Sequence, residues 1–480
     1  MVSYKNEKIH FIGVGGASMS ALAKLVYFQG GVVSGSDRER SKITCDLEKH
    51  FPVFYGEHPE IVEDCDKIIY SSAIQFDNLE LKRARELNIP TIERHKFLGE
   101  ISRKFQKTIA IGGTHGKTTV TAMVAHGLKA LGVNFSAHIG GETEYGNLIL
   151  SGDEIFVTEA CEYKKSLLSL KPFLSVLLNV ELDHPDCYED MKSLLRVYLT
   201  FLEQGEIQIF PAKLVNICRN EHMTISEYEK INNAFSAIEN AGKPKDEAVI
   251  VFSNGNMTIW SGGEMRIDNG TPYMSVYENE RYAGDIALFD KNMASTKNTL
   301  VVVSILALLG YSIERINDAL KFFKGVKRRN EFVGTLGGAR VVFDYAHHPT
   351  QIRHILSSIE GKKLVVFQPH TYSRTRAYFD EFVSALSLSD KVILMGTYGA
   401  REALIEGADS QALAEQISTK ISKTRVEYVK NTQQTIERVI SLKNDYEYIL
   451  FLGAGDIYLL KDELMPLLND VCHVEVQDIV

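Results

Sequence analysis

A loop of glycines with one lysine and two threonines carries the most specific chemistry in the sequence. It reads Gly113-Thr114-His115-Gly116-Lys117-Thr118-Thr119 and lies between an expected strand, 108–111, and an expected helix, 120–131. Backbone amides of such a loop cradle phosphates, the lysine reaches the β- and γ-phosphate oxygens, and a threonine hydroxyl binds Mg²⁺. Ile111 replaces the first glycine of the standard long P-loop. A turn that only caps a helix does not account for Gly-Lys-Thr-Thr, so the sequence predicts a site for ATP and Mg²⁺.

Two expected strands downstream of this loop end in groups that could hold the metal. The strand 155–158 is followed by Glu159, and the strand 174–178 leads to His184. Carboxyl ends of parallel strands share one edge of an open sheet, so these groups can converge on the loop. Glu159 is the first choice for Mg²⁺ beside Thr118, with His184 as a second ligand or a partner through water. The alternative is an ordinary surface acid and a solvated histidine.

A second glycine cluster stands near the start of the chain. Gly13-Val14-Gly15-Gly16-Ala17-Ser18 follows an expected strand, 8–14, and opens an expected helix, 19–29. Glycines let a phosphate approach the backbone, and a helix N-terminus supplies partial positive charge. Asp37 lies about twenty residues on, where an acid binds a ribose or sugar hydroxyl. Ser18 replaces the third glycine of the dinucleotide fingerprint, so a tight turn without a ligand and an NAD site are alternatives to a nucleotide-sugar site.

Basic and aromatic groups follow two expected strands of the last third of the chain. The run Asp344-Tyr345-Ala346-His347-His348-Pro349 follows one strand, and His370 and Arg374 follow another. These groups suit a carboxylate or phosphate ligand, and arginine binds either one bidentately. The histidine pair could instead bind a metal or cap a helix. The run Lys327-Arg328-Arg329 could reach ATP phosphates or be a solvated charged surface.

These motifs require an α/β protein with several parallel sheets, because strands alternate with helices along most of the chain. We predict three domains: a Rossmann-like N-terminal domain, 1–105, a P-loop ATPase-type central domain, 106–328, and a Rossmann-like C-terminal domain, 329–480. Glycine, asparagine, threonine and serine become frequent between 205 and 290. Short alternating runs there predict a β-rich insertion of antiparallel or irregular structure.

Composition excludes several classes of protein. The 480 residues include 53 Lys and Arg against 62 Asp and Glu, a formal net charge of −9 that excludes a general nucleic-acid binder. Six cysteines form no CxxC pair, which favours free thiols in a reducing compartment. The polar start and the short longest apolar run, 300–309, predict a soluble cytoplasmic protein without a membrane partner. The oligomeric state is not indicated.

Together these motifs resemble the Mur ligases of peptidoglycan precursor synthesis, over nearly the whole chain. The glycine loop with Gly-Lys-Thr-Thr is shared by all these ligases. The Asp-Tyr-Ala-His-His-Pro run and the Phe-Gln-Pro-His run at 367–370 resemble the alanine-adding branch. Further marks are Ser34-Gly35-Ser36-Asp37, Ser71-Ser72-Ala73-Ile74, Glu159-Ala160-Cys161-Glu162-Tyr163, Gly325-Val326-Lys327-Arg328-Arg329 and Gly453-Ala454-Gly455-Asp456-Ile457.

The resemblance implies an ATP-dependent ligase with UDP-N-acetylmuramate and L-alanine as substrates. ATP would phosphorylate the lactyl carboxylate, and the amine would attack the acyl phosphate to give amide, ADP and phosphate. By resemblance, catalytic residues are Lys117, Glu159, His184, His347 and Arg374. ATP is held by the Gly113 to Thr119 loop with Asn298, Arg328 and Asp344, and Mg²⁺ by Thr118, Glu159 and His184. The nucleotide sugar is held by Gly15, Gly16, Ser18, Met19, Asp37, Ser71, Asn147 and His348.

Three other functions compete with this interpretation. Ala294 and Ser295 stand where these ligases usually carry His-Asn, while Asn298 agrees, which motivates a catalytically weak homologue that binds UDP-sugar without turning over ATP. A murein-peptide recycling ligase would add a whole peptide to the same nucleotide sugar, but its start normally departs from the Gly-Val-Gly-Gly pattern. A nicotinamide oxidoreductase would explain only the first domain and would leave the lysine loop unused.

Overall fold

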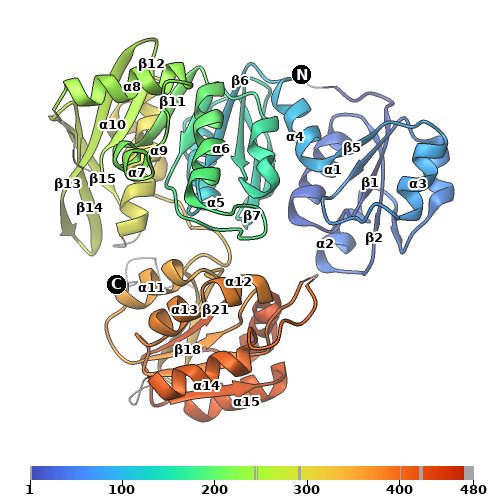
Figure 1. The fold of residues 1–480 in the computed structure, drawn as a ribbon, viewed down its shortest axis with the longest axis vertical. Coiled ribbons are helices and arrows are strands. Elements are labelled where there is room, and N and C mark those ends of the chain that lie inside the picture. Colours follow the sequence, from blue (N-terminus) through green and yellow to red (C-terminus); the bar gives the residue numbers. More distant parts are fainter. Residues whose placement is uncertain are drawn as a thin grey trace. The chain divides into compact units, whose positions relative to one another are not determined.

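The chain forms two units in the computed structural model, which describes residues 3–242, 245, 247–289, 293–400, 402–420 and 425–469. The first unit consists of Met1–Asp183 and Asp190–Lys324, and the second of His184–Glu189 and Gly325–Val480. Two sheets lie in the first unit and one in the second, each combined with helices, which confirms the α/β class (Figure 1). Among the described helices, none is long and apolar enough to cross a membrane.

Five parallel strands form the first sheet. They are β1 (Lys8–Ile12), β2 (Val32–Asp37), β3 (Val53–Tyr55), β4 (Lys67–Tyr70) and β5 (Thr91–Glu93), in the order β3-β2-β1-β4-β5. The longer helices beside them are α1 (Ala17–Phe28), α2 (Lys42–Leu47), α3 (Leu79–Glu86) and α4 (Arg94–Ser102). Because β1 is central and covered on both faces, its Ile9, Phe11 and Ile12 are almost fully buried. The predicted glycine loop, Asp37 and Ser71 therefore share the carboxyl edge of this sheet.

Ten strands form the second sheet, whose parallel part carries the lysine loop. The strands are β6 (Lys107–Gly112), β7 (Phe135–Thr143), β8 (Gly146–Leu150), β9 (Ile155–Ala160), β10 (Leu174–Leu177), β11 (Ile207–Pro211), β12 (Val249–Ser253), β13 (Asn256–Asp268), β14 (Thr271–Glu278) and β15 (Arg281–Ala287). Their order is β15-β14-β13-β12-β11-β10-β6-β9-β7-β8. β6 lies between β10 and β9, both parallel to it. The loop after β6 thus lies beside the carboxyl ends of the two strands from which metal ligands were predicted.

Helices accompany this sheet throughout. They are α5 (Lys117–Ala130), α6 (Met191–Gln204), α7 (Leu214–Asn220), α8 (Glu229–Asn240), α9 (Met293–Leu308) and α10 (Ile313–Leu320). α5 begins at the lysine itself, three residues earlier than the sequence predicts, and its side chains from Val120 to Leu128 are buried. α5 packs against α9 and α10 as well as against β7 and β9. The helix that presents the lysine is therefore held in the core of the unit.

The prediction for 205–290 was only partly right. β12 to β15 are antiparallel, as predicted, but they continue the main sheet. β11 is parallel to β10 and belongs to the parallel part of that sheet. The segment also contains α7 and α8, which the composition did not indicate. A five-residue apolar strand carries no local signal of its partner, so its parallel pairing was missed.

The second unit contains a six-stranded sheet. Its strands are β16 (Glu331–Leu336), β17 (Ala339–Asp344), β18 (Lys363–Phe367), β19 (Lys391–Met395), β20 (Arg425–Val429) and β21 (Tyr448–Leu452), in the order β16-β17-β21-β18-β19-β20. The helices are α11 (Pro349–Ser358), α12 (Tyr372–Ala377), α13 (Phe379–Leu386), α14 (Ser410–Lys420), α15 (Thr432–Leu442) and α16 (Leu460–Leu464). All neighbours are parallel except β16 and β17. β21 returns between β17 and β18, which makes a topological switch point at their carboxyl ends.

A charged cluster on this sheet predicts how the second unit responds to acid. The carboxylate of Glu427 accepts two hydrogen bonds from Arg438, of 2.6 and 2.7 Å, and pairs with the buried Lys391. The hydrogen bonds from Arg438 chiefly lower the pKa of Glu427, from 4.5 to about 2. Because the folded pKa is depressed, the stabilisation is present above about pH 4.5 and is lost as pH falls toward 2. With screening at this part-exposed site, we expect about 1–2 kcal/mol.

Glu427→Gln should therefore lower the unfolding temperature of the second unit at pH 7 and flatten its pH dependence between about pH 4.5 and 2. Calorimetry over this range measures the effect, and fluorescence of the single tryptophan, Trp260, reports on the first unit, which should be unaffected. Glu437→Gln removes an exposed carboxylate from α15 and is the matched control. An unchanged slope in the Glu427 variant would contradict the prediction.

Candidate functional site

The lysine loop adopts a conformation that glycine makes possible. Gly113 and Gly116 have φ values of +132° and +86°, which side chains with a Cβ rarely adopt. Gly116 directly precedes α5, so the loop wraps the N-terminus of a long helix. Phosphate oxygens are favoured at such a place, because the first-turn amides have no partner within the helix. The backbone therefore has the form that the sequence predicts for a phosphate cradle.

Lys117 folds back over the loop toward an acid that lies two residues after the end of the neighbouring strand β9. Its Nζ lies 2.9 and 3.1 Å from the two carboxylate oxygens of Glu162, and it also donates to the carbonyls of Gly113 and Thr114. The side chains of Lys117 and Glu162 are only 14% and 3% exposed. Burial is the largest single influence and lowers the pKa of Lys117, but the charge and hydrogen bond of Glu162, together with the charges of Cys161 and Glu159, outweigh it, and the pKa lies above its ordinary value. The lysine is thus held as a cation at the loop.

The end of β10 fixes the other side of the loop. Asn179 exchanges two hydrogen bonds of 2.9 Å with the backbone of His115. The hydroxyl of Thr114 donates to the carbonyl of Glu181 at 2.8 Å and accepts from its amide at 3.0 Å. The His115 ring lies 2.8 Å from the Glu181 carboxylate. Five contacts therefore tie the loop to residues more than sixty positions away, which fixes the shape of the cradle.

Glu159 and Thr118 provide oxygen ligands of the kind that Mg²⁺ prefers. Glu159 lies near the end of β9, and its Oε1 accepts a hydrogen bond of 2.6 Å from the amide of Gly140. Thr118 is in the first turn of α5 and is buried. These hard donors fit a magnesium ion. His184 belongs to the second unit, so its place beside Glu159 remains a prediction. Its backbone has a φ of +55°.

Asn298 and Cys161 also lie near the loop. A Cβ at Gly116 would lie 2.9 Å from Oδ1 of Asn298, so this asparagine, which was predicted to bind ATP, packs directly against the loop. Burial raises the pKa of the Cys161 thiol to about 11, which keeps it protonated and unreactive. Thr119 follows in the same helical turn as Lys117. Ala294, which stands where these ligases usually carry His, has a side chain that the structure does not describe.

The first glycine loop is closed by the acid that was predicted to bind a sugar. Oδ2 of Asp37 accepts a hydrogen bond of 2.7 Å from the amide of Gly15, and Oδ1 accepts one from Arg38. A Cβ at Gly15 would lie 2.8 Å from that carboxylate, which explains the glycine. Gly16 is the N-cap of α1, and Ser71 lies against Gly13. Asp37 therefore fixes the conformation of the first glycine loop through its hydrogen bond with Gly15.

Two other predicted sugar-binding residues have different surroundings. The Met19 side chain is 2% exposed and lies in the core of this part of the unit. Asn147, on β8, donates a hydrogen bond of 2.8 Å to the carbonyl of Ala17 and lies 3.4 Å from the Ser20 hydroxyl. Asn147 thus connects the central sheet to α1. Any substrate contact by either residue remains a prediction.

In the second unit, Asp344 is a buried carboxylate held by backbone amides. It accepts hydrogen bonds of 2.7 Å from Asn330 and from Ala346. Burial raises the pKa of Asp344, although Arg329 and these amides oppose the rise. The Arg328 guanidinium lies 4.8 Å from the ring centre of Tyr345 and donates to the carbonyl of Gly455 at 3.1 Å. Both predicted ATP contacts therefore organise the end of β17.

The predicted amino-acid residues of this unit lie near one another. The rings of His347 and His370 are 5.9 Å apart, and Arg374 lies 3.4 Å from Nδ1 of His370. His348 is instead the N-cap of α11. Thr371, the N-cap of α12, has φ +67°, an unusual value for a β-branched residue. Strain of this kind is often stored at functional sites, so the conformation agrees with a binding role for this loop.

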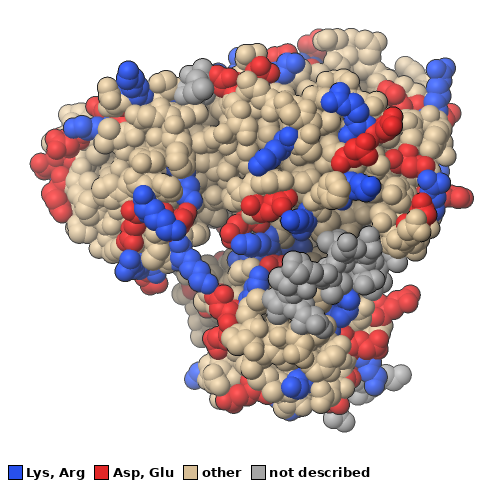
Figure 2. Space-filling model, turned by 180° about the vertical axis from the view of Figure 1, so that it is seen from behind, with Lys and Arg blue, Asp and Glu red and all other residues tan. Residues whose placement is uncertain are grey.

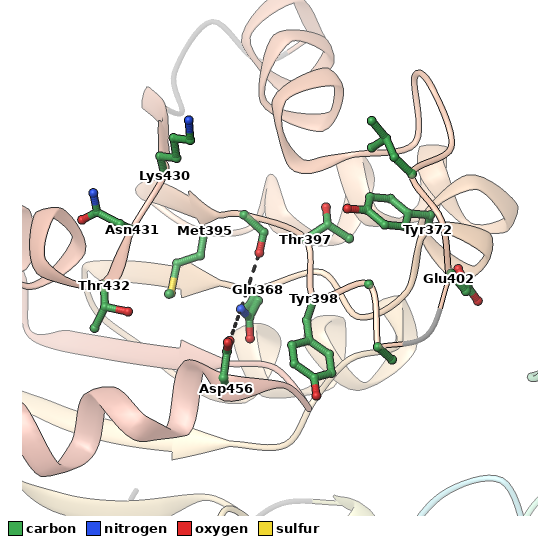
Figure 3. A pocket seen from close by; sticks show the side chains of 14 residues that line it. Gln368, Tyr372, Met395, Thr397, Tyr398, Glu402, Lys430, Asn431, Thr432 and Asp456 are labelled. Carbon is green, nitrogen blue, oxygen red and sulfur yellow. Dashed lines mark hydrogen bonds between the residues drawn. The ribbon is translucent and has the colours of Figure 1, made fainter. Parts of the chain in front are cut away.

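A cavity of about 490 Å³ adjoins this group at the carboxyl ends of β18, β19 and β21. Figure 3 shows Tyr372, Tyr398 and Lys430 around it, together with Asp456, which is hydrogen-bonded to Gln368. The ring of Tyr398 stacks on His370 at 5.4 Å. Ligands of open α/β sheets bind at switch points of this kind. The cavity thus joins polar and aromatic groups to the predicted amino-acid residues.

Surface charge is mixed on the face of the molecule drawn in Figure 2. Acidic and basic side chains are interspersed over the coloured part of the face in Figure 2. Lys117 and Arg374 are buried or nearly so. We expect the attraction of an anionic ligand to come chiefly from groups within each site and from helix N-termini, since exposed charges are screened.

Sequence reasoning missed the residues that hold the loops. Asn179 and Glu181 were not singled out, and Glu162 was named only within the run Glu159-Ala160-Cys161-Glu162-Tyr163. Each is a polar residue just after a buried strand, which is the signal that could have found it. Their pairing with Lys117 or the loop depends on which strands are neighbours, and that order is not readable locally.

Three models of known families match the chain. The model described as Mur ligase family, catalytic domain, matches residues 8–106, the Mur ligase middle domain matches 111–272, and the model described as Mur ligase, glutamate ligase domain, matches 328–455. The matches follow one another along the chain in the order of its three sheets. They cover the two glycine loops and the group around His347.

Known proteins are similar over nearly the full length. A protein of Acetivibrio thermocellus named UDP-N-acetylmuramate–L-alanine ligase is 33% identical over 476 residues, which cover 96% of this chain and 97% of the relative. One of the same name from Clostridium novyi is 35% identical and covers 94% and 96%. The crystal structure of the UDP-N-acetylmuramate–alanine ligase of Thermotoga maritima is 25% identical, with a TM-score of 0.75 and coverage of 96% and 98%.

Proposed function

The chain belongs to the Mur ligase family, and we propose that it joins L-alanine to the lactyl carboxylate of UDP-N-acetylmuramate in peptidoglycan precursor synthesis. The observation that carries this is similarity of nearly full length to relatives named for that reaction. The γ-phosphoryl group of ATP passes to the carboxylate, which yields an acyl phosphate and ADP. The amine of L-alanine then attacks the acyl carbon, and the tetrahedral intermediate expels phosphate and leaves the amide.

Such a transfer depends mainly on positioning and on neutralising phosphate charge. We assign ATP to the lysine loop, where Lys117 is held as a cation, with Asn298 beside it and with Arg328 and Asp344 from the second unit. Thr118 and Glu159 supply oxygen ligands for Mg²⁺, with His184 as a further ligand. Bound Mg²⁺ would neutralise phosphate charge. The proposed domains are 1–105, 106–328 and 329–480, in the cytoplasm.

The two substrates occupy the remaining sites in this proposal. The nucleotide sugar binds at the first glycine loop through Gly15, Gly16, Ser18, Asp37 and Ser71, with Asn147 and His348 near the muramoyl group. L-Alanine binds near His347 and Arg374, beside the cavity of Figure 3. An arginine suits the carboxylate of an amino acid, because its donors pair with both oxygens.

Two other functions have less support. A murein-peptide recycling ligase would use the same nucleotide sugar, and the 490 Å³ cavity would accept more than alanine. A weak homologue that binds UDP-sugar without turning over ATP would not need an intact lysine loop, whereas Lys117 is paired and buried there. The relatives described above are named for alanine addition, which favours the proposal.

Phosphate release separates these functions. The protein is incubated with ATP, Mg²⁺ and UDP-N-acetylmuramate, and then with L-alanine, glycine, L-serine or the murein tripeptide. The proposal expects release that requires both the nucleotide sugar and L-alanine. Release with the tripeptide alone would identify the recycling ligase. Binding of both nucleotides without release for any acceptor would identify the weak homologue.

A further inference from the structure

A buried histidine of the central sheet touches the first glycine loop. His138 lies on β7, is 3% exposed, and its Nε2 is 2.9 Å from the hydroxyl oxygen of Ser18. Ser18 is in the first turn of α1, where the proposed function places the nucleotide sugar. The guanidinium of Arg94, at the start of α4, donates to the same oxygen at 2.9 Å. Groups from three elements therefore meet at one half-buried hydroxyl.

The far side of the imidazole determines the direction of these hydrogen bonds. Nδ1 of His138 lies 3.1 Å from the hydroxyl of Thr158 on β9. That hydroxyl has one proton, and its other acceptor, the carbonyl of Glu159, is farther away at 3.4 Å. If Thr158 donates to Nδ1, a neutral imidazole carries its proton on Nε2 and must donate it to Ser18. Burial, with help from the Arg94 charge, lowers the pKa of His138 to about 4, so the ring is neutral at pH 7.

We propose that His138 is a positioning residue that turns the Ser18 hydroxyl into a donor for the anionic diphosphate of the nucleotide sugar. With the proton of His138 on Nε2, Arg94 and His138 both donate to the Ser18 oxygen, and these two bonds occupy its two lone pairs. The proton of Ser18 must then point to another acceptor, and a phosphate oxygen is a strong one. This inference rests on the proposed function, because it takes the diphosphate to lie at this helix N-terminus.

The same histidine connects this loop to the metal-binding strand. Thr158 precedes Glu159 on β9, and Gly140, which holds the Glu159 carboxylate, is two residues after His138 on β7. Asn147 adds a second contact between α1 and the central sheet. The orientation of Ser18 is therefore set by the strands that also carry the proposed magnesium ligand.

Binding of UDP-N-acetylmuramate by calorimetry tests the proposal. Ser18→Ala should weaken binding about 10-fold, because a hydrogen bond to a charged group is lost. His138→Leu should weaken it about 5-fold, and His138→Gln, which keeps an N–H donor, should recover most of the affinity. In the double variant Ser18→Ala/His138→Leu the loss should not exceed that of Ser18→Ala alone. In all of them KM for the nucleotide sugar should rise more than kcat falls.

A second measurement does not depend on any ligand. With ¹⁵N-labelled histidine, the NMR signals that disappear in His138→Gln identify the ring, and they should report the tautomer protonated at Nε2. His126→Leu is the matched control, since His126 is also buried in the central domain and contacts Tyr145. Protonation at Nδ1, multiplied losses in the double variant, or unchanged binding by His138→Leu would overturn the inference. Failure of the wild type to bind the nucleotide sugar would instead contradict the proposed function.

Discussion

Lys117→Ala is expected to lower kcat for phosphate release by about 10²–10³-fold while the affinity for UDP-N-acetylmuramate stays nearly unchanged. The amine is the cation of the lysine loop and compensates charge on the transferred phosphoryl group. The nucleotide sugar is assigned to a different sheet, at the first glycine loop. Steady-state kinetics measure the first effect and calorimetry the second. Lys129→Ala, an exposed lysine of the same helix, is the control. An equal loss of kcat and of affinity for UDP-N-acetylmuramate would contradict the assignment of ATP and the nucleotide sugar to separate sites.

The ion pair of Lys117 with Glu162 means that Lys117→Ala should also affect the stability of the protein. Removing the amine leaves Glu162, only 3% exposed, without its cation, and breaking a buried pair costs about 3–5 kcal/mol unless the acid takes up a proton. Lys117→Ala should therefore also lower the unfolding temperature. The double variant Lys117→Ala/Glu162→Gln should recover stability and remain inactive. Recovery of turnover along with stability would show that the lysine acts only through packing.

The predictable part of the fold was the part coded by neighbouring residues. The strand before the lysine loop and the helix after it were placed nearly where β6 and α5 lie, because a short apolar run and a glycine turn are local signals. The same holds for β17 and β18 of the second unit. β7 was missed, since its alternation is interrupted by Gly140 and its partners β8 and β9 define it as a strand.

The site was predictable only as a set of candidates at strand ends. Sequence spacing indicated that Lys117 and Glu159 lie near one edge, but it could not show that Lys117 pairs with Glu162. It could not show that Asp37 closes its own loop through Gly15, because that contact depends on the register of β1 and β2. The contact of Ser18 with His138 connects α1, beside the first sheet, to β7 of the second sheet, and no pattern of neighbouring residues indicates it. The domain boundaries and the site roles remain predictions.

Gly140→Ala should reduce turnover about 10²-fold without removing any functional group. A Cβ at this position would lie 2.6 Å from Oε1 and 2.8 Å from Oε2 of Glu159, so the carboxylate must move. Its hydrogen bond from the Gly140 amide, now 2.6 Å, would be lost or distorted. A misplacement of about 1 Å at a group that holds metal and phosphate can cost this much. The Mg²⁺ concentration for half-maximal activity should rise as well.

The magnesium dependence decides whether this effect passes through Glu159. Glu159→Gln removes one charge from the proposed metal site and should reduce turnover by at least as much as Gly140→Ala. The double variant should be no worse than Glu159→Gln alone, because both changes act on one carboxylate. Glu154→Gln, an exposed acid just before β9, is the control. Multiplied losses, or a Gly140→Ala enzyme with an unchanged magnesium requirement, would show that Gly140 affects the reaction by another route than Glu159. A Glu159→Gln enzyme with an unchanged magnesium requirement would show that Glu159 is not the ligand.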